Sequence, residues 1–239
     1  MGFPAGFPAG FPAYSNELWE AHKRNVHSQN GEDGLLAYLL DRLGIGGGWV
    51  VEVGAWDGVH LSNTFALVER SDAQFKALWI EGDPVKYADL GRTVARLPAG
   101  KAVAMHARLE EGKDSLGALM REAGVPEDEP GGVSTAVLSI DIDSFDYDVW
   151  AQLQFRPAVV VIEINSAVPP LDWKVYGRDG WRDGTSFLPT LLLGAAKGYT
   201  LAAHCGNMVF VRSDLWPRLG VPAGNPLACF HPGWLAAAV

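Results

Sequence analysis

The sequence predicts an α/β fold, in which a mostly parallel β-sheet is covered by helices on both faces. Strand-like apolar runs alternate with helix-like amphipathic segments from residue 49 to residue 198, which is the pattern of a parallel sheet. The run Ala-Val-Val-Val-Ile at 158–162 is apolar throughout and is typical of a central strand buried on both faces. Several runs end in acidic residues, so we expect these acids to gather at one edge of the sheet.

The chain begins with a repeat. Residues 2–13 repeat Gly-Phe-Pro-Ala three times. Because proline at every fourth position opposes both helix and sheet pairing, we expect a flexible tail at 1–14 and a single domain at 15–239. The alternative is a short interaction arm that uses Phe3, Phe7 and Phe11.

Two helices are expected before the first strand. Residues 16–23 suit a short amphipathic helix, and the leucine spacing at 35–43 suits a longer one that ends at Gly44. The segment 28–34, Ser-Gln-Asn-Gly-Glu-Asp-Gly, holds more polar groups than a helix cap needs. It is either a cap and turn or part of a ligand pocket, in which Gln29 contacts the ligand.

The remaining elements follow in alternation. We expect strands at 49–53, 75–80, 102–106, 136–140 and 158–162, and two closing antiparallel strands at 199–204 and 207–211. Helices are expected at 62–70, 87–97, 116–123, 146–154 and 186–198. The long segment 166–185 is expected to be a loop, either a lid or a loop packed on the core.

Composition and charge argue against several functions. A net charge of -9 opposes nucleic-acid binding by bulk electrostatics. No apolar run approaches the roughly 20 residues of a membrane span, so we expect none. Cys205 and Cys229 provide neither a disulfide framework nor metal-ligand spacing. We therefore expect reduced thiols and a cytoplasmic protein.

The first candidate site follows the apolar run at 49–51. Residues 52–58 read Glu-Val-Gly-Ala-Trp-Asp-Gly, an acidic and glycine-bearing turn. Glycine has no Cβ, so a ligand can approach the backbone closely. The spacing E-x-G-x-x-x-G differs from the dinucleotide fingerprint, and a carboxylate suits a ligand with hydroxyl or ammonium donors. We expect Glu52, Gly54, Asp57 and Gly58 to contact such a ligand.

Glu81 is the second candidate, at the end of the strand expected at 75–80. Its carboxylate can accept two hydrogen bonds from a ribose diol. The alternative is an acid at a helix start, because Asp83-Pro84 suits an N-cap followed by proline at the first helical position. Both can hold, with Asp83 capping the helix and Glu81 binding the ligand.

Four polar residues follow the fourth and fifth strands: Asp141, Asp143, Glu163 and Asn165. We expect Asp141 and Asp143 to point to opposite sides of their strand. One of them could then share a divalent cation such as Mg²⁺ with Glu163 or Asn165, and the cation would acidify a substrate hydroxyl. The alternative is that Asp141 binds the cofactor while Asp143 caps and solvates the next helix.

His204 is a candidate general base. It ends the strand expected at 199–204, and an unperturbed imidazole has a pKa near 6.5. A structural role is the alternative. His27, His60 and His106 are similarly ambiguous, and His60, which follows the first glycine turn, could face the pocket.

Taken in order, these segments resemble the FkbM-like branch of the class I S-adenosylmethionine (SAM)-dependent methyltransferases. The segments are SQNGEDG at 28–34, VEVGAWDG at 51–58, LWIEGDP at 78–84, LSIDID at 138–143, VVIEIN at 160–165, KGY at 197–199 and NMVFV at 207–211. The resemblance implies a Rossmann-like sheet of seven strands with the last strand antiparallel. It also implies SAM over the first two strand ends, with Glu52 and Gly54 along its methionine side and Glu81 on its ribose. Asp141 would lie near the methionine moiety or the reacting centre.

A metal is implied by similarity to sugar and catechol O-methyltransferases, which hold a divalent ion with acids after the fourth and fifth strands. Asp141 or Asp143, together with Glu163 and Asn165, occupy similar places. Two departures oppose it: Ser144 follows Asp143 where relatives more often have glycine, and the fifth strand lacks an acidic pair at its end.

The sequence therefore predicts a SAM-dependent O-methyltransferase for a small hydroxylated acceptor such as a sugar or glycoside. Asp141 and His204 are its candidate catalytic residues. One alternative is an enzyme that uses SAM without methyl transfer. Another is a non-catalytic binding or scaffold module with the same fold.

Overall fold

The computed structural model describes residues 15–70, 74–109, 115–128 and 132–231. Its strands are β1 Gly47–Val53, β2 Gln74–Glu81, β3 Ala102–His106, β4 Thr135–Ile140, β5 Val159–Glu163, β6 Tyr199–His204 and β7 Asn207–Arg212. Its helices are α1 Glu17–His22, α2 Glu32–Leu43, α3 Phe65–Val68, α4 Pro84–Val94, α5 Ser115–Glu122, α6 Asp146–Gln152 and α7 Phe187–Ala196, followed by the 3-10 helices η1 Trp216–Leu219 and η2 Pro226–Cys229. The tail predicted at 1–14 lies outside the described residues.

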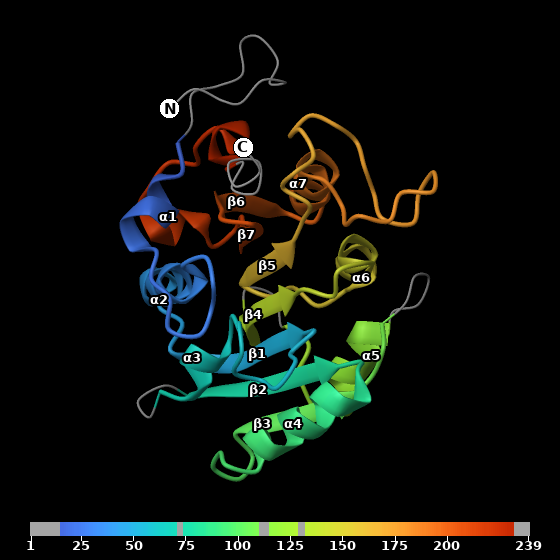
Figure 1. Ribbon diagram of the computed structural model, residues 1–239. Coiled ribbons are helices and arrows are strands. Elements are labelled where there is room, and N and C mark those ends of the chain that lie inside the picture. The colour runs from blue at the N-terminus through green and yellow to red at the C-terminus, as the bar shows by residue number, and fades with distance from the viewer. Residues whose placement is uncertain (1–14, 71–73, 110–114, 129–131, 232–239) are drawn as a thin grey trace.

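The strands form one sheet in the order β3-β2-β1-β4-β5-β7-β6 (Figure 1). β1 to β5 pair in parallel, and β7 lies antiparallel between β5 and β6. The predicted α/β class, with a mostly parallel seven-stranded sheet and an antiparallel last strand, is confirmed. The strand order reverses between β1 and β4, which is where open α/β sheets form their ligand crevice.

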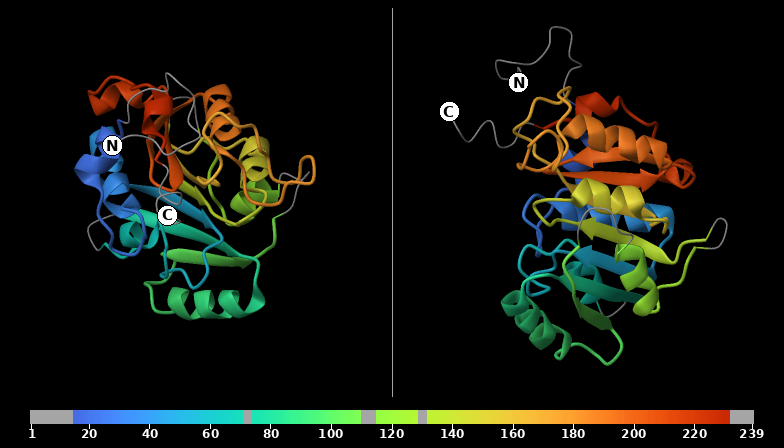
Figure 2. Two further views of the ribbon diagram at one scale, coloured as in Figure 1. Left: turned by 45° about the horizontal axis from the view of Figure 1, so that its top comes forward. Right: turned by 90° about the vertical axis from the view of Figure 1, so that its right-hand side faces the viewer.

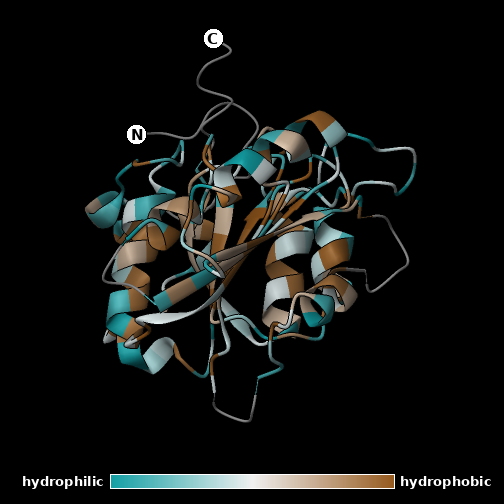
Figure 3. Ribbon diagram, turned by 90° about the horizontal axis from the view of Figure 1, so that it is seen from below, coloured by the Kyte–Doolittle hydropathy of each residue, from teal (hydrophilic) through white to brown (hydrophobic). Residues whose placement is uncertain are grey.

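Each face of the sheet carries its own apolar core. On one face, Leu39 of α2 shares a cluster with Trp79 of β2. On the other, Trp150 of α6 and Phe187 of α7 share a cluster with Ile162 of β5. Figures 1 and 2 show α1, α2 and α3 on one side of the sheet and α5, α6 and α7 on the other, and Figure 3 shows the apolar strands between them.

One helix is shorter than its sequence pattern. The prediction placed a helix at 62–70, but α3 has only four residues. The hydroxyls of Ser62 and Thr64 and the backbone N–H of Asn63 instead donate hydrogen bonds to the carboxylate of Glu52. A buried carboxylate is costly without such donors, and this requirement outweighs local helix propensity.

None of the helices in the described part of the chain combines the length and the apolar character that crossing a bilayer requires.

Candidate functional site

A pocket of about 520 Å³ lies at the carboxyl ends of β1, β2, β4 and β5. Its volume is in the range of small-molecule sites. The pocket brings together seven of the residues predicted from the sequence: Gln29, Glu52, Gly54, Glu81, Asp141, Asp143 and Glu163. Four other predicted residues are not among its lining residues: Asp57, Gly58, Asn165 and His204.

Gly54 allows two strand ends to meet. Its φ is +81°, in the left-handed region that favours glycine. A Cβ on Gly54 would run into the backbone carbonyl oxygen of Asp141. The glycine therefore brings the end of β1 against the end of β4, which fixes the floor of the pocket.

The carboxylate of Glu52 is held inside the protein. Glu52 is 5% exposed, and its oxygens accept hydrogen bonds from Ser62 Oγ at 2.6 Å, Thr64 Oγ1 at 2.6 Å and Asn63 N at 2.8 Å. Burial raises the pKa of Glu52, although these three donors oppose the rise. Glu52 thus shapes the pocket mainly by holding the loop that follows β1 in place.

Glu81 links two turns at the pocket. Its Oε2 accepts the backbone N–H of Trp56 at 2.8 Å, and its Oε1 accepts the backbone N–H of Asp83 at 2.7 Å. A carboxylate has about four lone-pair sites, so two backbone donors leave capacity for ligand hydroxyls. Asp83 in turn caps α4 by accepting the N–H groups of Val85 and Lys86.

Three carboxylates gather on the opposite wall. One oxygen from each of Asp141, Asp143 and Glu163 lies within 4.8 Å of the others. The expectation that Asp141 and Asp143 point to opposite sides was wrong. Residues two apart on a strand face the same side, and the chain leaves β4 after Ile140 and turns at Asp143, where φ is +56°.

The acidic wall, formed by Asp141, Asp143 and Glu163, holds two carboxyl groups whose pKa values are raised. Burial and the neighbouring Asp141 carboxylate raise the pKa of Glu163 to about 9, and burial also raises the pKa of Asp141. A hydrogen bond joins the two side chains, and it favours the charged form of Asp141 and the neutral form of Glu163. The hydrogen bond therefore favours the proton on Glu163 and the negative charge on Asp141.

Asp146 stabilises the turn that carries two residues of the acidic wall. Its two oxygens accept the backbone N–H groups of Ile142 at 2.8 Å and Ser144 at 2.9 Å. Burial raises the pKa of Asp146 to about 7. These bonds hold the turn that presents Asp141 and Asp143.

Asn165, predicted as a metal ligand, is engaged elsewhere. Its amide nitrogen donates to the carbonyl of Asp183, and its amide oxygen accepts the N–H of Ala167. Asn165 therefore fastens the two ends of the long loop after β5.

His204, predicted as a base, ends β6 and is fully buried against the segments that follow β5 and η2. Its Nδ1 accepts the backbone N–H of His231 at 2.8 Å, so the ring proton is on Nε2, which contacts Ser166 Oγ at 2.9 Å. Ser166 Oγ then donates to the carbonyl of Gly206. Burial lowers the pKa of His204 to about 3. Both ring nitrogens of His204 are occupied and its ring is not exposed, so we infer a structural role for it.

The polar segment at 28–34 acts mainly as a turn, and the N-cap of α2 is Gly31, which has no side-chain cap hydrogen bond. Oδ2 of Asp33 accepts the backbone N–H groups of Val26, His27 and Ser28, each at 2.8 Å. Only Gln29 of this segment lines the pocket, so it is the one position of 28–34 that a ligand there can reach.

Asp57 and Gly58 shape the turn after β1. Asp57 Oδ1 accepts the N–H groups of Val59 at 2.9 Å and His60 at 2.7 Å. Gly58 has a φ of +82°, and a Cβ there would lie 2.8 Å from a methyl group of Leu90. Both residues therefore act through the shape of the loop.

The pocket also contains residues that were not predicted: Trp56, Leu61, Lys86 and Arg108. His60, noted in the sequence for its place after the glycine turn, lines it as well. The Lys86 ammonium lies 3.8 Å from the ring centroid of Trp56. A weak signal existed for Lys86, which lies in the first turn of α4 after Glu81. The left-handed backbone that presents Trp56 and Leu61 has no signal in the sequence.

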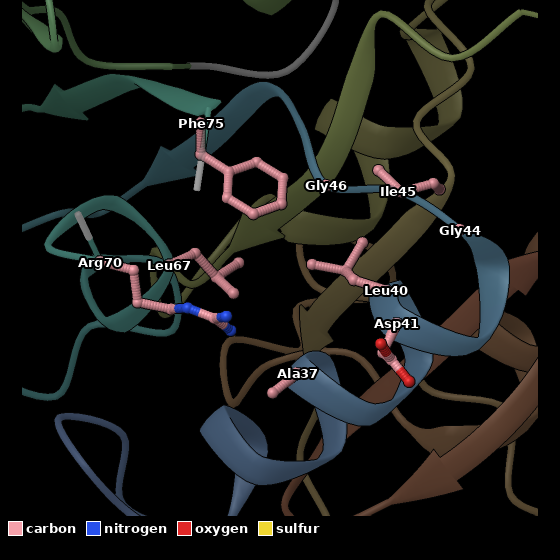
Figure 4. A pocket seen from close by; sticks show the side chains of 9 residues that line it. All are labelled: Ala37, Leu40, Asp41, Gly44, Ile45, Gly46, Leu67, Arg70 and Phe75. Atoms are coloured by element: carbon pink, nitrogen blue, oxygen red, sulfur yellow. The ribbon is translucent and has the colours of Figure 1, made fainter. Parts of the chain in front are cut away.

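A second pocket of about 330 Å³ lies at the other end of the strands, near the starts of β1 and β2. Leu40, Leu67 and Phe75 supply apolar side chains, and Asp41 and Arg70 supply charged ones (Figure 4). None of the predicted site residues lines this pocket.

Comparisons with known proteins give structural likeness only. No family model matches the sequence, and no curated protein matches it. The N-terminal domain of EvdMO1, crystallised in the presence of SAH and D-fucose, is 11% identical with a TM-score of 0.48, over 79% of this chain and 84% of that chain. A SAM-dependent methyltransferase from Aquifex aeolicus is 12% identical with a TM-score of 0.40, over 74% of this chain and 89% of that chain.

The CMeT domain of the citrinin polyketide synthase is 11% identical with a TM-score of 0.43. That match covers 70% of this chain and 46% of the other, so this chain spans about half of its length. At such identities and TM-scores, the likeness concerns the general fold and says nothing of the activity.

Proposed function

We propose that the protein is a SAM-dependent methyltransferase that methylates a hydroxyl oxygen of a small acceptor such as a sugar or glycoside. The observation that carries the proposal is a single pocket between Glu81 on one side and the Asp141–Glu163 pair on the other. The ordered resemblance of segments 28–34 to 207–211 to the FkbM-like methyltransferases supports it, and membership of that branch is part of the proposal.

The cofactor side is formed by β1 and β2. Glu81 would accept the ribose hydroxyls, because its carboxylate has accepting capacity beyond the two backbone N–H groups that it already binds. Gly54, which lines this side of the pocket, would lie along the methionine portion. Bound SAM supplies an electrophilic methyl carbon, whose bond to sulfur breaks as the acceptor oxygen attacks, leaving S-adenosylhomocysteine.

The ends of β4 and β5 form the wall that would face the acceptor hydroxyl to be methylated. Asp141 is the base of the proposal, because its hydrogen bond from Glu163 keeps it ionised while burial raises its pKa. A base of raised pKa takes up the proton of a hydroxyl more readily than an ordinary carboxylate does. His204 has no part in this scheme, since both its nitrogens are occupied.

A divalent cation is a finer part of the proposal. Asp141, Asp143 and Glu163 offer hard oxygen ligands close enough to share one ion, as Mg²⁺ requires. A cation held there would acidify an acceptor hydroxyl, and this arrangement is an alternative to the one in which Glu163 donates a hydrogen bond to Asp141. Asn165 drops out of the donor set because its amide is already engaged on both sides.

Calorimetric titration with SAM and S-adenosylhomocysteine, with Mg²⁺ or with EDTA, tests the proposal. We expect micromolar binding of both compounds. Glu81→Gln keeps the size of the side chain but removes its charge, and should weaken binding about tenfold or more. Glu122→Gln, on the exposed end of α5, is the matched control and should bind as the wild type does. Absence of binding by the wild-type protein in every condition would refute the proposed function.

A further inference from the structure

We propose that Trp56 and Leu61 form an apolar platform, the Trp56–Leu61 platform, that binds the acceptor through the C–H face of a neutral sugar-like ring. This inference rests on the proposed function and identifies the part of the pocket that selects the acceptor.

The platform is exposed where a ligand would cover it. Trp56 is 41% exposed and Leu61 is 43% exposed. Of the large exposed apolar side chains in the described ranges, these are the two that line the pocket. Apolar surface that is left open inside a polar pocket marks a place where a ligand buries it.

The platform is also held in place by a strained backbone. Both residues have left-handed φ values, +50° for Trp56 and +57° for Leu61. Such a conformation is unfavourable for a bulky residue, and it persists where the surrounding structure imposes it. Here Glu81 binds the N–H of Trp56, and Asp57 binds the N–H of His60 next to Leu61.

The ring of Trp56 has fixed neighbours. The Lys86 ammonium lies 3.8 Å from its centroid, and the His60 ring meets it edge-on at a centroid distance of 5.0 Å. These contacts restrict the rotation of the indole, so it offers the pocket a preset apolar surface at little entropic cost on binding.

The opposite wall completes the selection. Asp141 and Asp143 present carboxylate oxygens, which only accept hydrogen bonds when ionised. A sugar ring matches both walls, because it has an apolar C–H face for Trp56 and hydroxyl donors for the carboxylates. The acidic wall would repel a carboxylate or phosphate on the part of the acceptor that faces it, whereas the cationic side chains of the pocket, Lys86 and Arg108, lie outside this wall.

Saturation-transfer NMR of the full chain with S-adenosylhomocysteine tests the inference. The probes are methyl α-D-glucopyranoside, methyl β-D-galactopyranoside and methyl α-L-rhamnopyranoside, with glucuronate as the anionic counterpart. We expect transfer to the ring C–H protons of at least one neutral glycoside and none to glucuronate. Trp56→Asn and Leu61→Asn remove an apolar side chain but introduce asparagine, which tolerates the left-handed backbone. Trp56→Asn should weaken glycoside binding about tenfold.

Trp173→Asn, an exposed tryptophan on the loop after β5 that does not line the pocket, is the control and should leave glycoside binding unchanged. The inference is overturned if no neutral glycoside binds, if glucuronate binds as well as they do, or if Trp56→Asn leaves their binding intact. It is also overturned if Trp56→Asn weakens SAM binding instead, because Trp56 would then contact the cofactor. Loss of SAM binding in the wild type refutes the proposed function, whereas retained SAM binding without glycoside binding refutes this inference alone.

Discussion

Glu52→Gln should destabilise the fold, because the donors around Glu52 have fixed directions. Trp79 Nε1–H donates to Thr64 Oγ1 at 2.9 Å, so the Thr64 hydroxyl proton is directed to Glu52. Ser62 Oγ accepts the N–H of Thr64, and its proton also goes to Glu52. The N–H of Asn63 is the third donor. The buried side chain at position 52 therefore faces donors only.

The size of the effect follows from this geometry. A glutamine amide has one accepting oxygen and one donating NH2 group, so in either orientation the NH2 meets a donor. Loss of a hydrogen bond to a charged group costs about 1.5–3 kcal/mol, and a buried donor left unpaired costs about 1–3 kcal/mol. We expect the free energy of unfolding to fall by about 3 kcal/mol, which corresponds to a decrease in Tm of about 6–12 °C for a chain of this size.

Urea denaturation and thermal unfolding at pH 8 measure this change, with Glu122→Gln as the exposed control. The double variant with Thr64→Val shows whether the cost arises from this cluster. Without the Thr64 hydroxyl, the added cost of Glu52→Gln should shrink by about 1 kcal/mol or more. A Glu52→Gln protein within about 0.5 kcal/mol of the wild type would show that the three donors do not depend on the carboxylate.

Four further outcomes are expected. Gly54→Ala should lower stability by about 2 kcal/mol or more, whereas Gly91→Ala, which has open space in α4, should be neutral or stabilising by up to about 1 kcal/mol; equal Tm changes in the two variants would contradict this. Asp141→Asn should keep the Tm and reduce turnover about 100-fold or more, and a normal rate would remove it as the base. Because the pKa of Glu163 is raised to about 9, its carboxyl group contributes stability that is fully present below the ordinary glutamate pKa of 4.5. This contribution is lost as the pH rises through 9. Glu163→Gln should therefore gain Tm relative to the wild type between pH 5 and pH 9, and a constant difference would count against the shift. His204→Gln should lower the Tm but leave the pH profile of turnover between pH 5 and 8 unchanged, because a pKa of about 3 already keeps His204 neutral; loss of one limb of that profile would restore its role as a base.

The sheet was predictable because its strands are local apolar runs that end at turns. Val159–Glu163 is such a run, and its burial on both faces is evident from composition alone. Glu52 and Glu81 were placed correctly at the same edge, since parallel strands bring their carboxyl ends together. How much of each carboxylate is taken up by the protein was not predictable, because Ser62 and Trp56 approach through loops whose shape has no periodic signal.

The site was less predictable where distant segments meet. The environment of His204 depends on Ser166 and on the backbone of His231, which reach it from two separate loops. The engagement of Asn165 with Asp183 likewise depends on how the long loop closes. Sequence reasoning places a residue at the end of a strand, but it does not say which loop returns to cover it.

The place of β7 has a consequence for synthesis of the chain. β7 lies between β5 and β6, yet it is made after both of them. Until residues 207–212 have left the ribosome, the Val159–Glu163 strand keeps an unpaired apolar edge, which is the kind of edge that recruits strands from other chains. A ribosome stalled before residue 207 would hold a nascent chain that associates with other nascent chains, whereas one stalled well after residue 212 would hold a sheet in which β7 covers the edge of β5.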